Sequence, residues 1–326
     1  MECTSGNPYA VQVRARTSLA EALTQLPEEV HHDMLPAERV LHLLQTSKTI
    51  RKAVQNAKVH AHVKARSGVC FPDGIGLLEK LNRLTADCNV TVLGLAYCKM
   101  GNGGARAMLE FLRRNTTLEK LNLLRNEIGD DGARALAEAL RVNSTLRKLC
   151  LDDNNVGDDG ARALAEALHS NTTLTLLDLS YNILRDGAQA LAEALCSNTT
   201  LTSLCLRNNA LRDDGARALA EALHRNTTLT SLELAQNLIR DDGAQALAEA
   251  LCSNTTLTSL DLAANHIRDD GAQALAEALC SNTTLRELKL SMNSIGDDGA
   301  RALAEALLRN TMLTSLRITE NIIRDD

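Results

Sequence analysis

A unit of 28 residues recurs along most of this 326-residue chain. The motif Asn-Thr-Thr-Leu, or a close variant, opens successive units at 115, 143, 171, 198, 226, 254, 282 and 310. An earlier unit begins at Asp87, which gives eight full units of 27–28 residues over 87–309 and a truncated ninth over 310–326. One such unit cannot bury its own apolar face, so the repeat predicts a stack in which each unit is stabilised by its neighbours.

The unit at 254–281 shows what each repeat is expected to form. Leu257, Leu260 and Leu262 predict a short strand whose leucines point into the core. Asn265 follows, and Asn stands at the equivalent position in nearly every unit. A side-chain amide both donates and accepts hydrogen bonds, so stacked Asn residues are expected to satisfy buried backbone groups at a turn.

The second half of the same unit predicts a helix. Ala272–Leu279 places Ala and Leu at helical spacing, so one face packs on the strands. The pair Asp269 and Asp270 precedes it, and we expect these carboxylates to cap the helix that they open. In the unit at 171–197 a single Asp replaces the pair, which predicts a tighter turn there.

The pattern LxxLxLxxNxIxDDGAxALAEAL over 87–326 resembles ribonuclease-inhibitor-type leucine-rich repeats. That class includes ribonuclease inhibitor, the repeats of NOD-like receptors and the Ran GTPase-activating protein. The resemblance implies an α/β solenoid with a curved parallel sheet on its concave side, helices on its convex side, and a protein partner bound to the sheet. The chain stops at the start of the next expected helix, so we interpret it as a fragment that lacks its carboxy-terminal cap.

The first 86 residues lack the repeat and divide into three expected segments. Residues 1–24 form a partly flexible lead, 25–57 a small helical segment, and 58–86 a degenerate half-repeat that caps the solenoid. The stretch LPAERVLHLLQTSKTIRKAV, which starts at Leu35, resembles the second half of an F-box, the segment that binds the Skp-type adaptor of a cullin ubiquitin ligase. The alternative is a plain helical cap on the first repeat. By the F-box resemblance, the adaptor-binding residues are Leu26, Pro27, Leu35, Pro36, Leu41, Leu44 and Ile50.

Side chains that point outward from the strands differ between repeats, and we expect a partner protein to recognise them. The candidate partner-binding residues are Tyr97, Lys120, Arg125, Asp152, Asp153, Asp178, Tyr181, Arg207, Glu233, Asp261, Lys289 and Arg317. They give the face a mixed basic start, an acidic middle and a basic end. We therefore expect a salt-sensitive complex between a monomer of this chain and a partner with a basic patch. The alternative is ordinary solvated surface charge.

Composition excludes several function classes. Aromatic residues make up 2% of the chain and its net charge is −6, which disfavours nucleic acid as a partner. No apolar run approaches the roughly 18 residues of a membrane span. Nine cysteines without an export signal favour reduced thiols in the cytoplasm, or in the nucleus. No nucleotide-binding loop or complete metal-ligand set is present, so we expect no metal and no cofactor.

The sequence therefore predicts a non-enzymatic scaffold that binds a protein partner. Its sharper form is an F-box substrate receptor, in which the repeats hold the target and 25–57 holds the adaptor. Two alternatives remain open: a Ran-type GTPase-activating protein, and the repeat portion of a NOD-like sensor.

Overall fold

The computed structural model describes residues 9–15, 35–36, 59–65 and 90–324. The chain divides into two compact units, 1–154 and 155–326.

The first unit contains six described strands and two described helices. They are β1 (Tyr9–Ala15), β2 (Leu35–Pro36), β3 (Val59–Ala65), β4 (Val90–Gly94), α5 (Gly101–Arg114), β5 (Lys120–Asn122), α6 (Asp130–Val142) and β6 (Lys148–Cys150). β1 pairs antiparallel with both β2 and β3, whereas β3, β4, β5 and β6 pair in parallel in that order.

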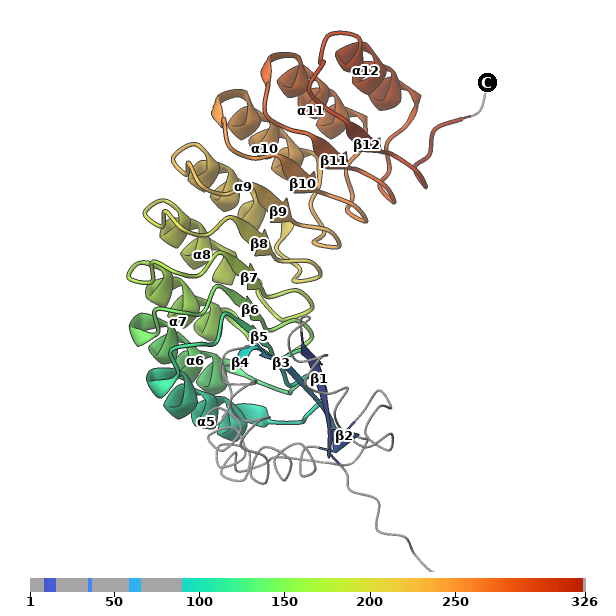
Figure 1. Ribbon diagram of the computed structural model, residues 1–326. Helices are drawn as coiled ribbons and strands as arrows, with labels where there is room; N and C mark the ends of the chain where they lie inside the picture. The colour runs from blue at the N-terminus through green and yellow to red at the C-terminus, as the bar shows by residue number, and fades with distance from the viewer. Residues whose placement is uncertain (1–8, 16–34, 37–58, 66–89, 325–326) are drawn as a thin grey trace, which may run out of the picture. The chain divides into compact units, whose positions relative to one another are not determined.

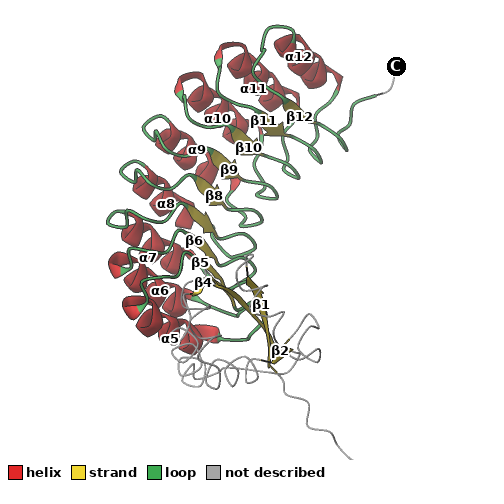
Figure 2. Cartoon of the chain, in the orientation of Figure 1, coloured by secondary structure: helices red, strands yellow, loops and turns green. Residues whose placement is uncertain are grey.

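The second unit alternates helix and strand throughout. Its elements are α7 (Asp158–Leu168), β7 (Leu176–Asp178), α8 (Gly187–Leu195), β8 (Ser203–Cys205), α9 (Arg212–Leu223), β9 (Ser231–Glu233), α10 (Asp241–Ser253), β10 (Ser259–Asp261), α11 (Asp269–Ser281), β11 (Glu287–Lys289), α12 (Asp297–Leu307) and β12 (Ser315–Arg317). The strands lie side by side in chain order and pair in parallel, and the helices line one side of them (Figure 1, Figure 2). The structure thus confirms the α/β solenoid that the repeat predicts.

The core of each repeat is aliphatic and lies between its strand and its helix. In the repeat that begins at Asn254, Leu257, Leu260, Leu262 and Leu275 are all fully buried. Alanines fill the remaining helix positions on this side, and Ala272 is also fully buried. Such small side chains let neighbouring helices approach closely, which is why the core needs almost no aromatic residue.

The expected asparagine ladder is confirmed. The Asn237 side chain is fully buried, and its Oδ1 atom accepts a hydrogen bond from the backbone N–H of Asn209 at 2.9 Å. Its Nδ2 atom donates to the carbonyl oxygen of Leu206 at 2.8 Å, and Asn265 makes equivalent contacts one repeat later. Each amide thereby satisfies buried backbone groups in two neighbouring repeats.

The expectation that the paired Asp residues cap their own helix is wrong. Asp241 and Asp269 are instead the first helical residues of α10 and α11, and the residues that precede them make no side-chain cap. The Oδ1 atom of Asp241 accepts hydrogen bonds from the backbone N–H groups of Arg268 and Gly271, which open α11. The carboxylate therefore caps the helix of the following repeat, while the N–H groups that open its own helix are bound by Asp213 of the preceding repeat.

The repeat with a single Asp has a shorter helix. α8 has 9 residues, whereas α7 has 11 and α10 has 13. The cap from the preceding repeat is kept, since Asp158 Oδ1 accepts from the backbone N–H groups of Asp186 at 2.9 Å and Gly187 at 2.7 Å.

The segments before the repeats are described only in part. β3 lies within 58–86, the expected degenerate half-repeat, and β1 lies within the lead expected to be partly flexible. Leu35 and Pro36 form β2, a strand where a helical segment was expected. The other adaptor-binding candidates, and the rest of 25–57, lie outside the described residues; these candidates are Leu26, Pro27, Leu41, Leu44 and Ile50.

Candidate partner-binding face

The outward side of the strands is the candidate binding surface, and we call it the strand face. Each strand from β5 to β12 has three residues, of which the central leucine points into the core. The flanking residues point the other way because side chains alternate along a strand. A short strand thus offers two outward positions per repeat, at a spacing set by the sheet.

In the second unit the last residue of each strand belongs to one line across the sheet. Parallel register places Asp178 opposite Cys205, and Cys205 opposite Glu233. The line continues in the same register through the next strands. We call this set the charged row, and its members are Asp178, Cys205, Glu233, Asp261, Lys289 and Arg317.

The end of the charged row near β12 is internally neutralised. Lys289 Nζ lies 3.4 Å from Asp261 Oδ2 and 3.8 Å from Glu287 Oε2. Arg317 Nη2 lies 3.9 Å from Glu287 Oε1. The predicted basic end therefore already has carboxylate partners within the chain.

The acidic end of the row has no such partner. Among the residues that the structure describes, no Lys or Arg forms an ion pair with Asp178 or Glu233. Glu233 is half-buried, and its burial raises the pKa of the carboxyl group, to which repulsion from Asp261 adds. The charge of Lys289 and a hydrogen bond with the Cys205 side chain oppose this rise only in part. A cation placed over Cys205, between the two carboxylates, would relieve this repulsion.

Next to the acidic end, Tyr181 and Arg207 are held together. The Arg207 guanidinium carbon lies 5.6 Å from the centroid of the Tyr181 ring. Arg207 Nε and Tyr181 Oη both donate hydrogen bonds to Oε1 of Gln236, at 2.9 Å and 3.2 Å. These three side chains come from the turns that follow β7, β8 and β9, and we call them the Tyr181 cluster.

A related cluster lies in the first unit. The Arg125 guanidinium carbon lies 5.5 Å from the Tyr97 ring centroid, and Arg125 Nε donates to Asp153 Oδ2. Asp153 raises the pKa of Arg125 through this hydrogen bond and through its charge. Here the guanidinium is therefore compensated by a carboxylate of the chain itself.

The predicted candidates thus fall into two groups. Those of the first unit are Tyr97, Lys120, Arg125, Asp152 and Asp153, and those of the second are Asp178, Tyr181, Arg207, Glu233, Asp261, Lys289 and Arg317. Gln236 was not among the predicted candidates, although it stands at the same repeat position as Tyr181 two units later. Reading that position down the repeats would have found it.

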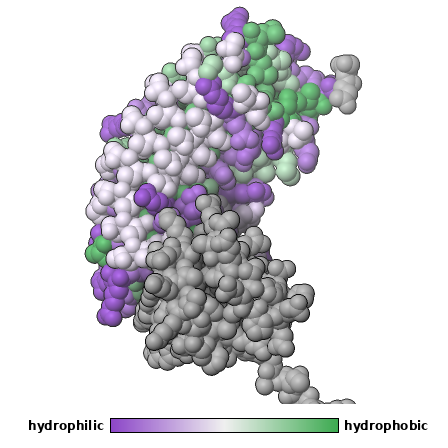
Figure 3. Space-filling model, in the orientation of Figure 1, coloured by the Kyte–Doolittle hydropathy of each residue, from purple (hydrophilic) through white to green (hydrophobic). Residues whose placement is uncertain are grey.

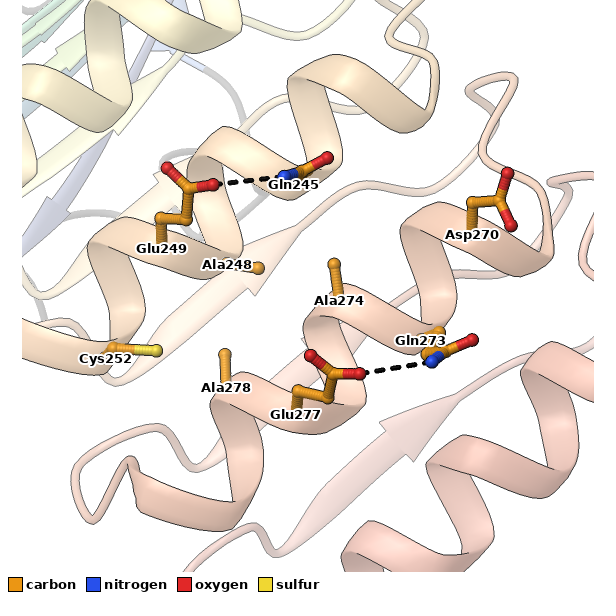
Figure 4. A pocket seen from close by; sticks show the side chains of 9 residues that line it. All are labelled: Gln245, Ala248, Glu249, Cys252, Asp270, Gln273, Ala274, Glu277 and Ala278. Carbon is orange, nitrogen blue, oxygen red and sulfur yellow. Dashed lines mark hydrogen bonds between the residues drawn. The ribbon is translucent and has the colours of Figure 1, made fainter.

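The helix side of the described repeats carries shallow grooves. One of about 380 Å³ lies between α10 and α11, where Glu249 and Glu277 flank a floor of Ala residues (Figure 4). Each of these carboxylates accepts a hydrogen bond from a Gln of its own helix, at 3.2 Å and 3.1 Å. The groove follows from small residues on adjacent helices, and its polar groups do not converge on a common point.

Two further surface features lie outside the strand face. Exposed apolar side chains gather at the last two repeats, where Leu308 is 87% and Ile322 is 65% exposed, in agreement with the hydrophobic surface near the carboxy terminus in Figure 3. The described cysteines are free thiols, three of them exposed: Cys196, Cys252 and Cys280. No described helix has the length and apolarity needed to cross a membrane.

Comparisons with known proteins identify the repeats. A family described as Leucine Rich repeat matches 114–137, 142–165, 170–192, 197–220 and 225–248, and the TMOD/LMOD Leucine-rich domain matches 244–322. No curated protein sequence matches significantly. Together with the fold, these matches show that the chain is a leucine-rich-repeat protein.

Many solved structures resemble part of the chain. One, titled "Leiomodin-1 Actin-Binding Site 2 (ABS2)", is 28% identical with a TM-score of 0.37, and the match covers 41% of this chain and 78% of that one. Another, the tropomodulin C-terminal domain of Caenorhabditis elegans, is 19% identical with a TM-score of 0.38, and covers 40% of this chain and 82% of that one.

Proposed function

We propose that this leucine-rich-repeat protein is a non-enzymatic scaffold whose strand face in the second unit binds a basic segment of a protein partner. The observation that carries the proposal is the acidic end of the charged row, where no described Lys or Arg forms an ion pair with Asp178 or Glu233. Asp178 and Glu233 flank the small side chain of Cys205, and burial together with Asp261 holds the Glu233 pKa above its usual value. A bound cation would be stabilised by both carboxylates.

Lys289 illustrates the contact that the partner is proposed to make. Its ammonium group lies over the carboxylate of Asp261, one strand away in the same row. A lysine or arginine of the partner would make the same kind of contact over β8, two strands from β10, where Asp178 and Glu233 lie on either side of it. Since the charges are only half-buried, added salt should weaken the complex.

The test compares two double variants of the full-length protein. Asp178→Asn with Glu233→Gln removes the acidic end, while Asp214→Asn with Glu221→Gln removes the same charge from α9 on the helix side. Proteins recovered from cells with the wild type are identified by mass spectrometry, and their affinities are then measured with purified components. We expect the first variant to lose the partner and the second to retain it. Equal retention by both would refute the proposal.

The sharper form of the proposal is a substrate receptor of a cullin ubiquitin ligase, with 25–57 holding a Skp-type adaptor. It is supported by the F-box resemblance in that segment. Leu41→Asp with Leu44→Asp should abolish recovery of the adaptor and cullin while leaving the strand-face partner bound. Stimulation of GTP hydrolysis by the purified protein would instead favour a GTPase-activating role.

A further inference from the structure

We propose that Arg207 is a receptor for a carboxylate of the partner, so that the bound segment carries an acidic residue beside its basic one. This inference rests on the proposed function and adds the second charge that the partner must present. The chain has two Tyr–Arg clusters. In the closed cluster, Arg125 is paired with a carboxylate of the chain; in the open cluster, Arg207 forms no ion pair with a described carboxylate.

Arg207 is held in place without being neutralised. The Tyr181 ring lies against its guanidinium, and the amide oxygen of Gln236 accepts from Nε at 2.9 Å. A second hydrogen bond from the Tyr181 hydroxyl fixes that same amide oxygen. An amide oxygen orients a guanidinium but carries no net charge. Ordering the side chain in advance lowers the entropy cost of binding a partner.

The outer edge of this guanidinium is available. Arg207 is exposed, and no carboxylate among the described residues forms an ion pair with it. Since Nε is engaged by Gln236, the two terminal nitrogens remain to present their N–H groups to solvent. Two such parallel donors match the two oxygens of a carboxylate.

The first unit shows what an Arg–Tyr pair binds in this fold. There the Arg125 guanidinium also lies against a tyrosine, Tyr97, and its Nε donates to Asp153. The closed cluster thus contains an internal carboxylate, while the open one has the neutral Gln236 as its hydrogen-bond acceptor. The missing element of the open cluster is a negative charge, which we assign to the partner.

The geometry sets the spacing of the two partner charges. The parallel ladder continues past β8, since Leu206 N–H donates to the Glu233 carbonyl and Asn208 N–H to the Ala235 carbonyl, each at 2.9 Å. The chain is therefore extended from Cys205 to Arg207, and these side chains lie on one face about 7 Å apart. A basic residue over Cys205 and an acidic residue over Arg207 then fit two positions apart in an extended partner segment.

This arrangement selects a protein segment of mixed charge. A polyanion would meet Asp178 and Glu233 when it reached Arg207, and a purely basic segment would place a cation against the guanidinium. A basic residue followed two positions later by an acidic one satisfies both sites in a segment that runs parallel to β8. Like-charge contacts of this kind disfavour the wrong partners.

Two synthetic peptides test the inference on the full-length protein. Acetyl-Gly-Thr-Arg-Thr-Asp-Thr-Gly-amide carries both charges, and its Asn counterpart carries only the basic one. The Nε–H signals of ¹⁵N-arginine-labelled protein are followed by NMR during titration, with Arg207 assigned from its loss in Arg207→Gln. We expect the Asp peptide to bind about fivefold more tightly than the Asn peptide and to shift the Arg207 signal.

Two variants separate the possible results. Arg207→Gln should abolish the preference for the Asp peptide, whereas Arg125→Gln, the matched change in the closed cluster, should preserve it. Equal binding of the two peptides to the wild type, or a preference that survives Arg207→Gln, would overturn the inference while leaving the proposed function standing. Failure of both peptides to bind would also overturn the inference. If the double variant Asp178→Asn with Glu233→Gln binds the peptides as tightly as the wild type, the result counts against the proposed function itself.

Discussion

The Oδ1 atom of Asp269 accepts a hydrogen bond from the backbone N–H of Gly299 at 2.9 Å, thirty residues further along the chain. The N–H of Gly296 donates to the same oxygen at 2.7 Å. These donors belong to the start of α12, where backbone N–H groups have no partner within the helix. Asp213 and Asp241 make the same contacts to the helices that follow them. In these repeats the first Asp of the pair therefore caps the helix of the following repeat.

Removing this cap should destabilise the second unit. Asp269→Ala leaves two N–H groups of α12 without their acceptor, and we expect a loss of about 1–2 kcal/mol in the free energy of unfolding. Urea denaturation followed by circular dichroism measures it. Asp269→Asn should cost clearly less, since Asn102 caps α6 natively through its Oδ1 atom at 2.8 Å and 3.0 Å.

The neighbouring Asp270 supplies the control for this prediction. It is exposed, and none of the described residues forms an ion pair with it. Asp270→Ala should change stability by no more than about 0.5 kcal/mol. If both alanine variants lose the same stability, the cap is not the cause.

The glycine after each Asp pair should be sensitive to a single added methyl group. A Cβ on Gly271 would lie 2.8 Å from Asp241 Oδ1 and 2.8 Å from Ile267 Cγ2. Gly→Ala inside a helix normally stabilises by up to about 1 kcal/mol. Here we expect Gly271→Ala to destabilise by about 1–3 kcal/mol, because the cap and the core must both move. Thermal unfolding measures the sign, and a stabilised variant would show that the capping contact is loose.

The asparagine ladder should be the most costly element to interrupt. Asn237→Ala removes the acceptor of the Asn209 N–H and the donor to the Leu206 carbonyl, both in the core. Each buried group left unpaired costs about 1–3 kcal/mol, so we expect a loss of about 3 kcal/mol or more. Asn208→Gly is the control, since Asn208 is exposed and has a φ of 55°, which glycine adopts without strain. Chemical denaturation should separate the two variants clearly.

The raised pKa of Glu233 predicts a pH-dependent stability. The folded state favours the protonated carboxyl, so stability is fully present below the ordinary value of 4.5 and is lost as pH rises through the raised pKa. Glu233→Gln should therefore be more stable than the wild type at neutral pH. The difference should disappear on acidification below 4.5, and urea midpoints measured across this range would reveal it. A difference that does not depend on pH would exclude burial of the charge as its source.

The strands, the helices and the core of the repeats could be read from the sequence because each recurs. Leu260 and Asn237 have the positions that the repeat predicts, and their burial follows from the period alone. The cap by Asp269 could not be read in this way. Sequence proximity suggests that an Asp caps the helix it opens, and only the offset between stacked repeats shows that it reaches the next one.

The sequence predicted which residues point outward at the candidate site, but it did not predict which of them form ion pairs and hydrogen bonds with each other. Outward positions such as Asp178 and Glu233 follow from strand alternation, and Lys289 was expected as a separate basic end. Its pairing with Asp261 depends on the register of two strands and on side-chain length. Gln236 was missed because, although it shares the repeat position of Tyr181, it is neither charged nor aromatic; its role is evident where Tyr181 and Arg207 both donate to its oxygen.

The caps made by Asp158, Asp213, Asp241 and Asp269 all run from one repeat to the helix of the following repeat, so the two ends of the stack are not equivalent. Cutting away a repeat at the carboxy-terminal side leaves an aspartate that water solvates readily, whereas cutting at the amino-terminal side leaves bare N–H groups on a helix that depended on the lost residue. The loss of stability on removing a terminal repeat therefore differs between the two ends of the stack. A shortened version of this protein should tolerate trimming from its carboxy-terminal end better than from its amino-terminal end, although the repeats are nearly identical.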